Sequence, residues 1–130
     1  MSAHIAMIAL LVRDYDEAIA WYRDALGFVL LEDDDRGGGK RWVRMAPPGN
    51  IHFSVILARA VTAAQEAAIG NQHGGRVGFF LHTDDFARDH ARLTAAGAHF
   101  EESPRHETYG TVVVFRDLYG NRWDLIERSQ

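Results

Sequence analysis

The pattern of apolar and polar positions predicts short strands separated by turns, with three stretches of helical spacing. The predicted strands span residues 4–12, 28–31, 41–45, 51–57, 76–83, 98–101, 111–116 and 120–127. The predicted helices span residues 14–26, 61–69 and 84–96. Two polar stretches, a charged and glycine-rich one at 33–39 and another at 103–109, are predicted to be loops, the first of them mobile.

The first predicted helix has a signal at each end. Asp14 is a good N-cap, Glu17 stands at the capping-box position three residues later, and Gly27 is typical of the residue that follows a helix. The predicted core face consists of residues at helical spacing, namely Ala18, Trp21, Tyr22 and Ala25.

The two halves of the chain carry the same landmarks at an offset of 71 residues, which places Asp14 on Asp85 and the GlyAsn pair at 49–50 on that at 120–121. We therefore expect an α+β fold, a single domain over 1–130. It consists of two tandem βαβββ modules at about 4–57 and 76–127, with a linker at 58–75. One helix covers only one face of each sheet, so two modules side by side would form a concave mixed sheet enclosing a cup.

Asp124 stands in the middle of the last predicted strand, on the same face as Arg122 and Ile126. Aspartate is uncommon inside strands, and a carboxylate that leaves water needs a partner, a metal ion or a proton. Two interpretations are open. Asp124 is either a ligand-binding or catalytic group in the cup, or a solvent-facing residue or ion-pair partner of Arg122.

Composition excludes several classes of function. The chain has 130 residues, a net charge of −4 and no basic cluster, so neither nucleic acid nor an anionic membrane is an expected partner. It has no cysteine, which excludes disulfides, thiol catalysis and thiolate metal sites. No signal peptide is visible and no apolar run reaches the roughly 18 residues of a membrane span, so a cytoplasmic location is expected.

Two segments resemble signatures of the vicinal oxygen chelate superfamily, which includes glyoxalase I, extradiol dioxygenases and bleomycin-resistance proteins. Residues 12–28, VRDYDEAIAWYRDALGF, resemble its first strand-to-helix signature, and residues 115–127, FRDLYGNRWDLIE, resemble its closing signature. The resemblance covers nearly the whole chain and implies the fold of that superfamily. It does not select an activity, because members include isomerases, dioxygenases, epimerases, lyases and non-enzymatic binding proteins.

The resemblance also implies where a metal would bind. Metal-dependent members hold a divalent ion with His, Gln or Glu from the first and last strands of each module. The matching positions here are Met7, Gly78, Asp124 and, depending on register, Phe53 or Ser54. A thioether is a weak ligand for hard divalent ions, and one carboxylate does not hold a catalytic metal. We therefore expect the metal site to be lost and no cofactor to be bound.

Three functions remain compatible with the sequence. The first is metal-free binding of a small molecule. The second is a lactoylglutathione-lyase-like lyase or isomerase, or a dioxygenase, with a metal site rebuilt from His52, His82 and Asp124. The third is a metal-free enzyme that uses Asp124 and one of these histidines as acid and base. The candidate ligand-contacting residues are aromatic or polar side chains expected near the cup, with one methionine: Met7, Trp42, His52, Phe80, His82, Tyr109 and Asp124. The resemblance also implies a possible homodimer.

Overall fold

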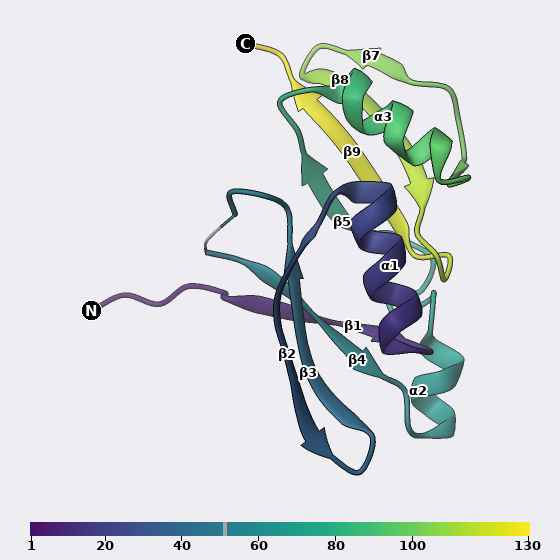
Figure 1. Ribbon diagram of the computed structural model, residues 1–130. Helices are drawn as coiled ribbons and strands as arrows, with labels where there is room; N and C mark the ends of the chain where they lie inside the picture. Colours follow the sequence, from purple (N-terminus) through teal and green to yellow (C-terminus); the bar gives the residue numbers. More distant parts are fainter. Residues whose placement is uncertain (51) are drawn as a thin grey trace. The chain divides into compact units, whose positions relative to one another are not determined.

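The computed structural model describes residues 1–50 and 52–130, which form two compact units, Met1–Ile69 and Gly70–Gln130. The first unit contains β1 (Met7–Val12), α1 (Tyr15–Leu26), β2 (Val29–Gly37), β3 (Lys40–Ala46), β4 (Ser54–Arg59) and α2 (Ala63–Ala68). The second contains β5 (Val77–His82), α3 (Phe86–Ala95), β6 (His99–Phe100), β7 (Arg105–Glu107), β8 (Gly110–Arg116) and β9 (Arg122–Arg128), and Figure 1 labels all of these except β6. The predicted α+β class is confirmed. None of the described helices is long and apolar enough to cross a membrane.

Each unit has its own mixed sheet. The strand order is β1-β4-β3-β2 in the first unit and β5-β9-β8-β6 in the second, where β7 also pairs with β8. In both units the first strand pairs in parallel with the last, and the other pairs are antiparallel. Parallel pairing places Met7 opposite Ser54 and Phe80 opposite Asp124.

Helix α1 begins and ends as the sequence predicts. Asp14 is the N-cap, and its carboxylate accepts a hydrogen bond of 2.8 Å from the backbone N–H of Glu17. Gly27 adopts the left-handed conformation, with φ of 69°, and its N–H donates to the carbonyl of Arg23 at 2.9 Å. Both contacts satisfy backbone groups that a helix end leaves unpaired.

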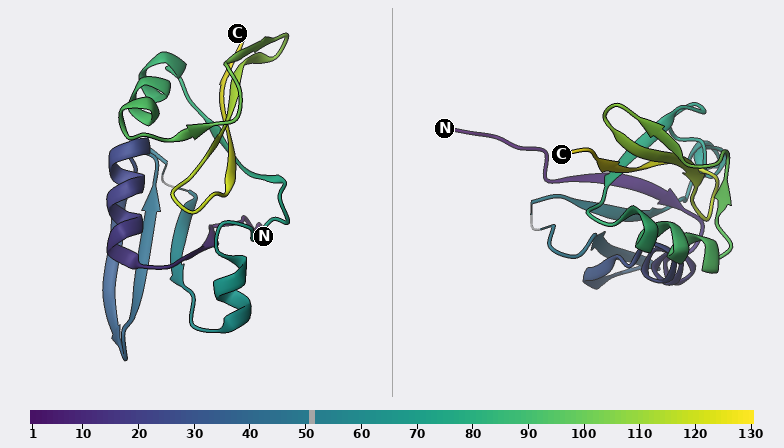
Figure 2. Two further views of the ribbon diagram at one scale, coloured as in Figure 1. Left: turned by 90° about the vertical axis from the view of Figure 1, so that its right-hand side faces the viewer. Right: turned by 90° about the horizontal axis from the view of Figure 1, so that it is seen from above.

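The core of the first unit lies between α1 and one face of its sheet (Figure 2). The buried side chains that meet there include Ala18, Tyr22, Ala25, Leu10, Val43 and Leu57. Trp21, predicted for the same core face, is only half-buried, and its ring meets the edge of Tyr22 at 5.1 Å between centroids.

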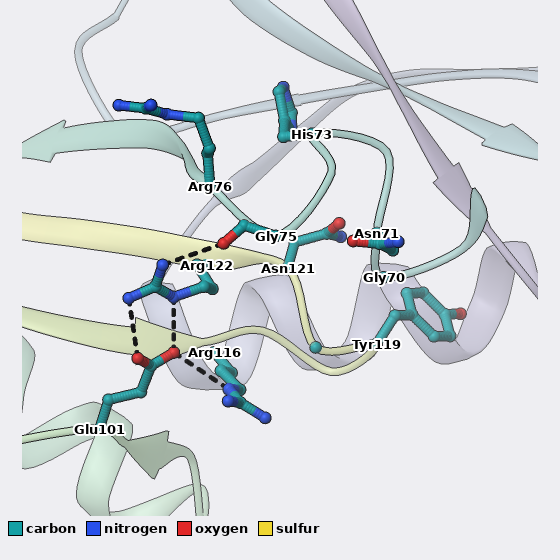
Figure 3. Close-up of a pocket in the computed structure, with 11 residues that line it drawn as sticks. Gly70, Asn71, His73, Gly75, Arg76, Glu101, Arg116, Tyr119, Asn121 and Arg122 are labelled. Atoms are coloured by element: carbon teal, nitrogen blue, oxygen red, sulfur yellow. Dashed lines mark hydrogen bonds and ion pairs between the residues drawn. The ribbon is translucent and has the colours of Figure 1, made fainter.

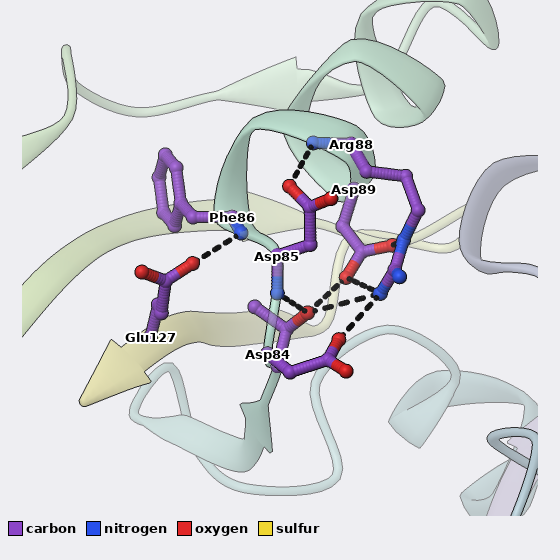
Figure 4. Close-up of polar contacts among 7 residues, drawn as sticks. Asp84, Asp85, Phe86, Arg88, Asp89 and Glu127 are labelled. Atoms are coloured by element: carbon purple, nitrogen blue, oxygen red, sulfur yellow. Dashed lines mark hydrogen bonds and ion pairs between the residues drawn. The ribbon is translucent and has the colours of Figure 1, made fainter.

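Helix α3 is fixed to the second sheet at its N-terminus (Figure 4). Asp85, one of the two predicted caps, accepts a hydrogen bond of 3.0 Å from the backbone N–H of Arg88. The Arg88 side chain pairs with the buried Asp89 at 3.1 Å, and Glu127 on β9 accepts from the backbone N–H of Phe86 at 2.8 Å. These carboxylates therefore have structural roles.

The prediction of a mobile loop at residues 33–39 is wrong. Strand β2 continues to Gly37, and only Gly38 and Gly39, both with positive φ, form the turn to β3. The two side-chain nitrogens Nε and Nη2 of Arg41 donate to the Asp33 carboxylate at 3.0 and 2.7 Å across the hairpin. This pairing holds the pKa of Asp33 below its ordinary value and keeps an acidic stretch in a strand.

Several other boundaries differ from the prediction. The predicted loop at 103–109 contains strand β7, which adds to β8. The fourth strand begins at Ser54, while its predicted start, Ile51, lies outside the described residues. The last strand begins at Arg122, because the preceding backbone folds into a turn around the Asp117 carboxylate.

Candidate functional site

The face of the first sheet opposite α1 carries a connected set of polar side chains. Glu32 on β2 accepts hydrogen bonds from Arg44 Nε and, at 3.4 Å, from Trp42 Nε1. Arg44 Nη1 donates at 3.0 Å to the hydroxyl of Ser54 on β4. The hydrogen bond from Arg44 holds the pKa of Glu32 below its ordinary value. Arg44 is thus oriented by a carboxylate on one side and a hydroxyl on the other.

A pocket of about 380 Å³ opens beside Arg44. Its lining includes the apolar Met7, Leu31 and Phe53 and the polar Arg44, Asn50 and His52. The structure therefore brings together two of the predicted contact residues, Met7 and His52. His52 lies on the connection before β4 rather than on the strand, because β4 begins two residues later.

The second sheet presents Asp124 on the face that alternation predicts. On the neighbouring strand β5, Asp124 is paired with Phe80, which is 63% exposed. His82 lies on the same face of β5 and is paired with Ile126 of β9. These three predicted residues, Phe80, His82 and Asp124, are therefore neighbours on one open sheet face. Arg122 shares that face, but its guanidinium pairs with Glu101 instead of Asp124.

The surroundings of Asp124 change its acid–base behaviour. Burial raises the pKa of its carboxyl above the ordinary value, with Glu102 acting in the same direction and the guanidinium groups of Arg105 and Arg122 opposing it. Within the described parts of the chain, no hydrogen bond or ion pair engages this carboxylate. Asp124 is thus a half-buried acid on the open sheet face, and its carboxylate has no partner among the described residues.

Gly78, the position that the resemblance assigns to a metal ligand on β5, has no room for a side chain. A Cβ atom there would lie 2.6 Å from Cε1 of His73 and still closer to Cγ and Nδ1 of the same ring. The His73 ring is itself packed edge-on against Phe79, with 5.0 Å between centroids. An imidazole from the preceding loop therefore fills the space next to Gly78.

Two predicted residues line neither the pocket beside Arg44 nor the sheet face around Asp124. Tyr109 is in the turn between β7 and β8, and the adjacent Gly110 pairs with Arg128, four positions along β9 from Asp124. Four strand residues correspond to roughly 13 Å. Trp42 lies on the open face of the first sheet, but the Arg36 guanidinium packs over its ring at 5.6 Å.

Among the described residues, no group of three or more His, Asp or Glu side chains is arranged to hold a metal ion. The rebuilt set suggested by the sequence divides between the units, since His52 belongs to the first and His82 and Asp124 to the second. At the positions given by the resemblance, Met7 supplies a thioether. The position in the first unit that matches Asp124 is either Phe53, which has no ligand atom, or Ser54, which pairs with Met7 and whose hydroxyl already accepts from Arg44.

Comparison with known proteins identifies the family. Residues 4–125 match the family model of the glyoxalase/bleomycin resistance protein/dioxygenase superfamily. The chain belongs to this superfamily. An uncharacterised protein from Shewanella frigidimarina is 51% identical over 128 residues, which cover 98% of this chain and 95% of that protein.

Solved structures agree with the assignment to the glyoxalase/bleomycin resistance protein/dioxygenase superfamily. UcmS2 is 27% identical with a TM-score of 0.82, over 98% of this chain and 99% of its own. TnmS3, an antibiotic binding protein from Streptomyces sp. CB03234, is 29% identical with a TM-score of 0.78, over 98% of each chain. The family and fold implied by the resemblance are thereby confirmed.

Proposed function

We propose that this superfamily member binds a small organic molecule on the open faces of its sheets, without the divalent metal of metal-dependent members. The observation that carries the proposal is the set of donors at the ligand positions. These are a thioether at Met7, no side chain at Gly78, one carboxylate at Asp124 and, depending on register, a phenyl ring at Phe53 or a hydroxyl at Ser54. A hard divalent ion requires several oxygen or imidazole ligands, so these residues do not fit it. The Arg44 guanidinium next to Ser54 would also repel a cation.

The pocket beside Arg44 has the make-up of a small-molecule site. Its volume of about 380 Å³ lies in the range usual for such sites, which combine apolar walls with a few oriented polar groups. Met7 and Phe53 supply apolar surface, and Arg44, held by its partners, supplies directed N–H donors. The directed N–H donors of Arg44 favour a ligand that carries a hydrogen-bond acceptor, and the likeness to TnmS3, an antibiotic binding protein, supports the binding of a small molecule.

A second candidate function is metal-free acid–base catalysis at the other open face. The raised pKa of Asp124 favours it, because a carboxyl that holds its proton nearer to neutral pH can act as a general acid or base. His82 on the same face would be its partner. This candidate differs from simple binding by a single property, namely turnover of the bound molecule that continues in the presence of a chelator.

We also propose that the protein forms a homodimer in the cytoplasm. Strand β2 is at the edge of the first sheet, and it begins with three consecutive exposed apolar residues, Val29, Leu30 and Leu31. An exposed apolar edge strand favours association with another chain. The absence of cysteine suits a reducing compartment.

The experiment that tests the binding proposal is a titration of chelator-treated protein with two probes, the dye 8-anilinonaphthalene-1-sulfonate and bleomycin. We expect saturable binding of at least one probe, monitored by dye fluorescence and calorimetry, and no change in its dissociation constant when Mn²⁺ or Ni²⁺ is added. Phe53→Ala should weaken binding by about tenfold or more, because it removes a wall of the pocket.

The matched control is Val61→Ala, which shortens an apolar side chain that is 69% exposed and does not line this pocket. It should leave the dissociation constant unchanged. Stoichiometric metal in the purified protein by elemental mass spectrometry, together with binding that requires the metal, would reject the proposal. Equal effects of the two alanine substitutions would place the ligand elsewhere.

A further inference from the structure

An acidic and an aromatic side chain lie next to each other on the open face of the second sheet. Asp124 of β9 pairs with Phe80 of β5 in the parallel ladder, so both side chains point to the same face. Neighbouring strands are about 4.8 Å apart, so one ligand group can touch both residues. Among the described residues, Asp124 takes part in no hydrogen bond or ion pair, and Phe80 takes part in no ring contact.

The Phe80–Asp124 pair is accessible and has apolar neighbours. Phe80 is 63% exposed, more than any other aromatic residue that the structure describes. Across the other ladder Asp124 pairs with Val114 of β8, and Ile126 follows it on the same face of β9. A ligand that covers the exposed ring removes apolar surface from water and therefore gains affinity.

The Asp124 carboxylate would gain from a positively charged partner, because it has lost part of its hydration. Burial raises the pKa of its carboxyl group, which means that the surroundings disfavour the charged form. The neighbouring strands remove water without supplying a hydrogen-bond donor in exchange. A cation that approaches from the open face would replace the lost interaction, whereas an anion would be repelled.

The other charges around Asp124 already neutralise one another. Three arginines and three glutamates form ion pairs there, namely Arg105, Arg116, Arg122, Glu101, Glu102 and Glu107. Figure 3 shows part of this set, in which Arg116 and Arg122 donate to the carboxylate of Glu101. Arg105 forms the other part, with ion pairs of 2.9 and 2.8 Å to the two remaining glutamates. Asp124 therefore adds one negative charge to a set that is otherwise balanced.

The next arginines along the two strands are too distant to compensate this charge. Arg76 and Arg128 each lie four residues along the chain from a member of the Phe80–Asp124 pair. Four residues of an extended strand span roughly 13 Å, whereas charges in physiological salt are screened over about 8 Å.

We propose that the Phe80–Asp124 pair binds the positively charged group of an organic cation, such as a protonated amine. The carboxylate supplies the opposite charge, and the face of the phenyl ring supplies a cation–π contact. The apolar part of the ligand covers the ring. This inference rests on the proposed function, to which it adds the charge of the ligand at the second sheet.

Three probes of one shape and different charge test the inference in the wild-type protein at about pH 8. Tryptamine, tryptophol and indole-3-propionate carry the same ring on a two-carbon chain, which ends in an ammonium, a hydroxyl and a carboxylate group. We expect tryptamine to bind about 3- to 30-fold more tightly than tryptophol, the factor for one ion pair and one cation–π contact. Indole-3-propionate should bind more weakly than both.

Two substitutions separate the contributions of charge and ring. Asp124→Asn keeps the shape of the side chain and should bring the affinity for tryptamine down to that for tryptophol. Phe80→Leu keeps an apolar side chain without a π face, and it should weaken tryptamine about 2- to 5-fold more than tryptophol. The matched control Asp24→Asn, which removes an exposed carboxylate paired with Arg23 on α1, should change neither affinity.

The readouts are calorimetry and NMR titration of ¹⁵N-labelled protein, in which the backbone amides of Phe80 and Asp124 should shift. Equal affinities for tryptamine and tryptophol would overturn the inference, and this comparison needs no variant. A preference for tryptamine that survives Asp124→Asn would also overturn it, as would shifts confined to the pocket beside Arg44. The proposed function is judged separately, because its failure would appear as the absence of saturable binding in the dye and bleomycin titrations.

Discussion

A single added methyl group can test whether the His73 ring fills the space beside Gly78, the position on β5 that the resemblance assigns to a metal ligand. The substitution is Gly78→Ala, made both in the wild-type protein and in the His73→Ala variant. Gly78 is the glycine for this test because its φ is not positive, so alanine suits its backbone and only the neighbouring ring opposes it.

The expected magnitude depends on how far the ring must move. The new Cβ would lie 2.6 Å from Cε1 of His73, whereas carbon atoms in contact normally stay about 3.5–4.0 Å apart. The ring must therefore move by about 1 Å or more and give up its edge-on packing against Phe79. Overpacking of this kind costs about 1–3 kcal/mol, while replacing glycine reduces the entropy of the unfolded chain and returns about 0.4–1 kcal/mol.

We expect Gly78→Ala to lower the free energy of unfolding of the wild-type protein by roughly 0.5–2 kcal/mol. In the His73→Ala background the same change should raise it by about 0.4–1 kcal/mol, because the obstacle is gone. The four proteins are compared by urea unfolding followed by circular dichroism, with the denaturant slope checked for each protein. The coupling energy of the double-mutant cycle should be about 1–3 kcal/mol.

Additive effects, within about 0.5 kcal/mol, would refute the reasoning. They would show that His73 does not occupy the space beside Gly78. The proposed loss of the metal site would then rest on the chemistry of the donors alone, and a Gly78→His variant could be tested for metal binding.

Three further predictions concern carboxylates of the second unit. Asp117→Ala removes the acceptor of five hydrogen bonds and should lower the free energy of unfolding by about 3–5 kcal/mol in urea melts; a change below about 1 kcal/mol would contradict this. Burial raises the pKa of Asp124, so its ionised form opposes folding above the folded-state pKa, and this destabilisation vanishes below the ordinary pKa of 3.8. Asp124→Asn should therefore raise the free energy of unfolding at pH 7 and leave it unchanged at about pH 3.5. A difference between the variant and the wild type that does not depend on pH would count against this prediction. The Arg122 guanidinium lowers the pKa of Glu101, so the contribution of this carboxylate to stability is present above pH 4.5 and disappears as the pH falls through the folded-state pKa. Glu101→Gln should therefore lower the free energy of unfolding at pH 7 and should approach the wild-type value in acid. Equal stability of the two proteins at neutral pH would exclude the ion pair as a source of stability.

The parts of the fold that the sequence predicts well depend on contacts between near neighbours. The two ends of α1 are examples, because Asp14 meets the N–H of Glu17 and Gly27 meets the carbonyl of Arg23. The orientation of Asp124 is predictable for a similar reason, since the alternation of side chains in a strand has a fixed period of two.

The parts that the sequence does not predict depend on partners far along the chain. Aspartates disfavour strands, and Asp33 stays in β2 because Arg41 pairs with it across the hairpin. Arg44 hydrogen-bonds to both Glu32 and Ser54, so these three residues form one network. The predicted second strand ends at residue 31, so the prediction does not place Glu32 on the sheet face that carries this network. The alternation of Trp42 and Arg44 on β3 is the one available signal that both side chains share the open face.

The parallel pairing of the first and last strands in each unit has a consequence for how the protein is made. β1 can form its ladder only with β4, so Met7 must wait for Ser54 to be synthesised. At about 5–20 residues per second, this delay is roughly 2–9 s. The β2–β3 hairpin can form during that time, because its contacts are local. The largely apolar strand Met7–Val12 stays without a partner and can pair with a strand of another chain, so the newly made protein is most prone to aggregate before β4 is complete.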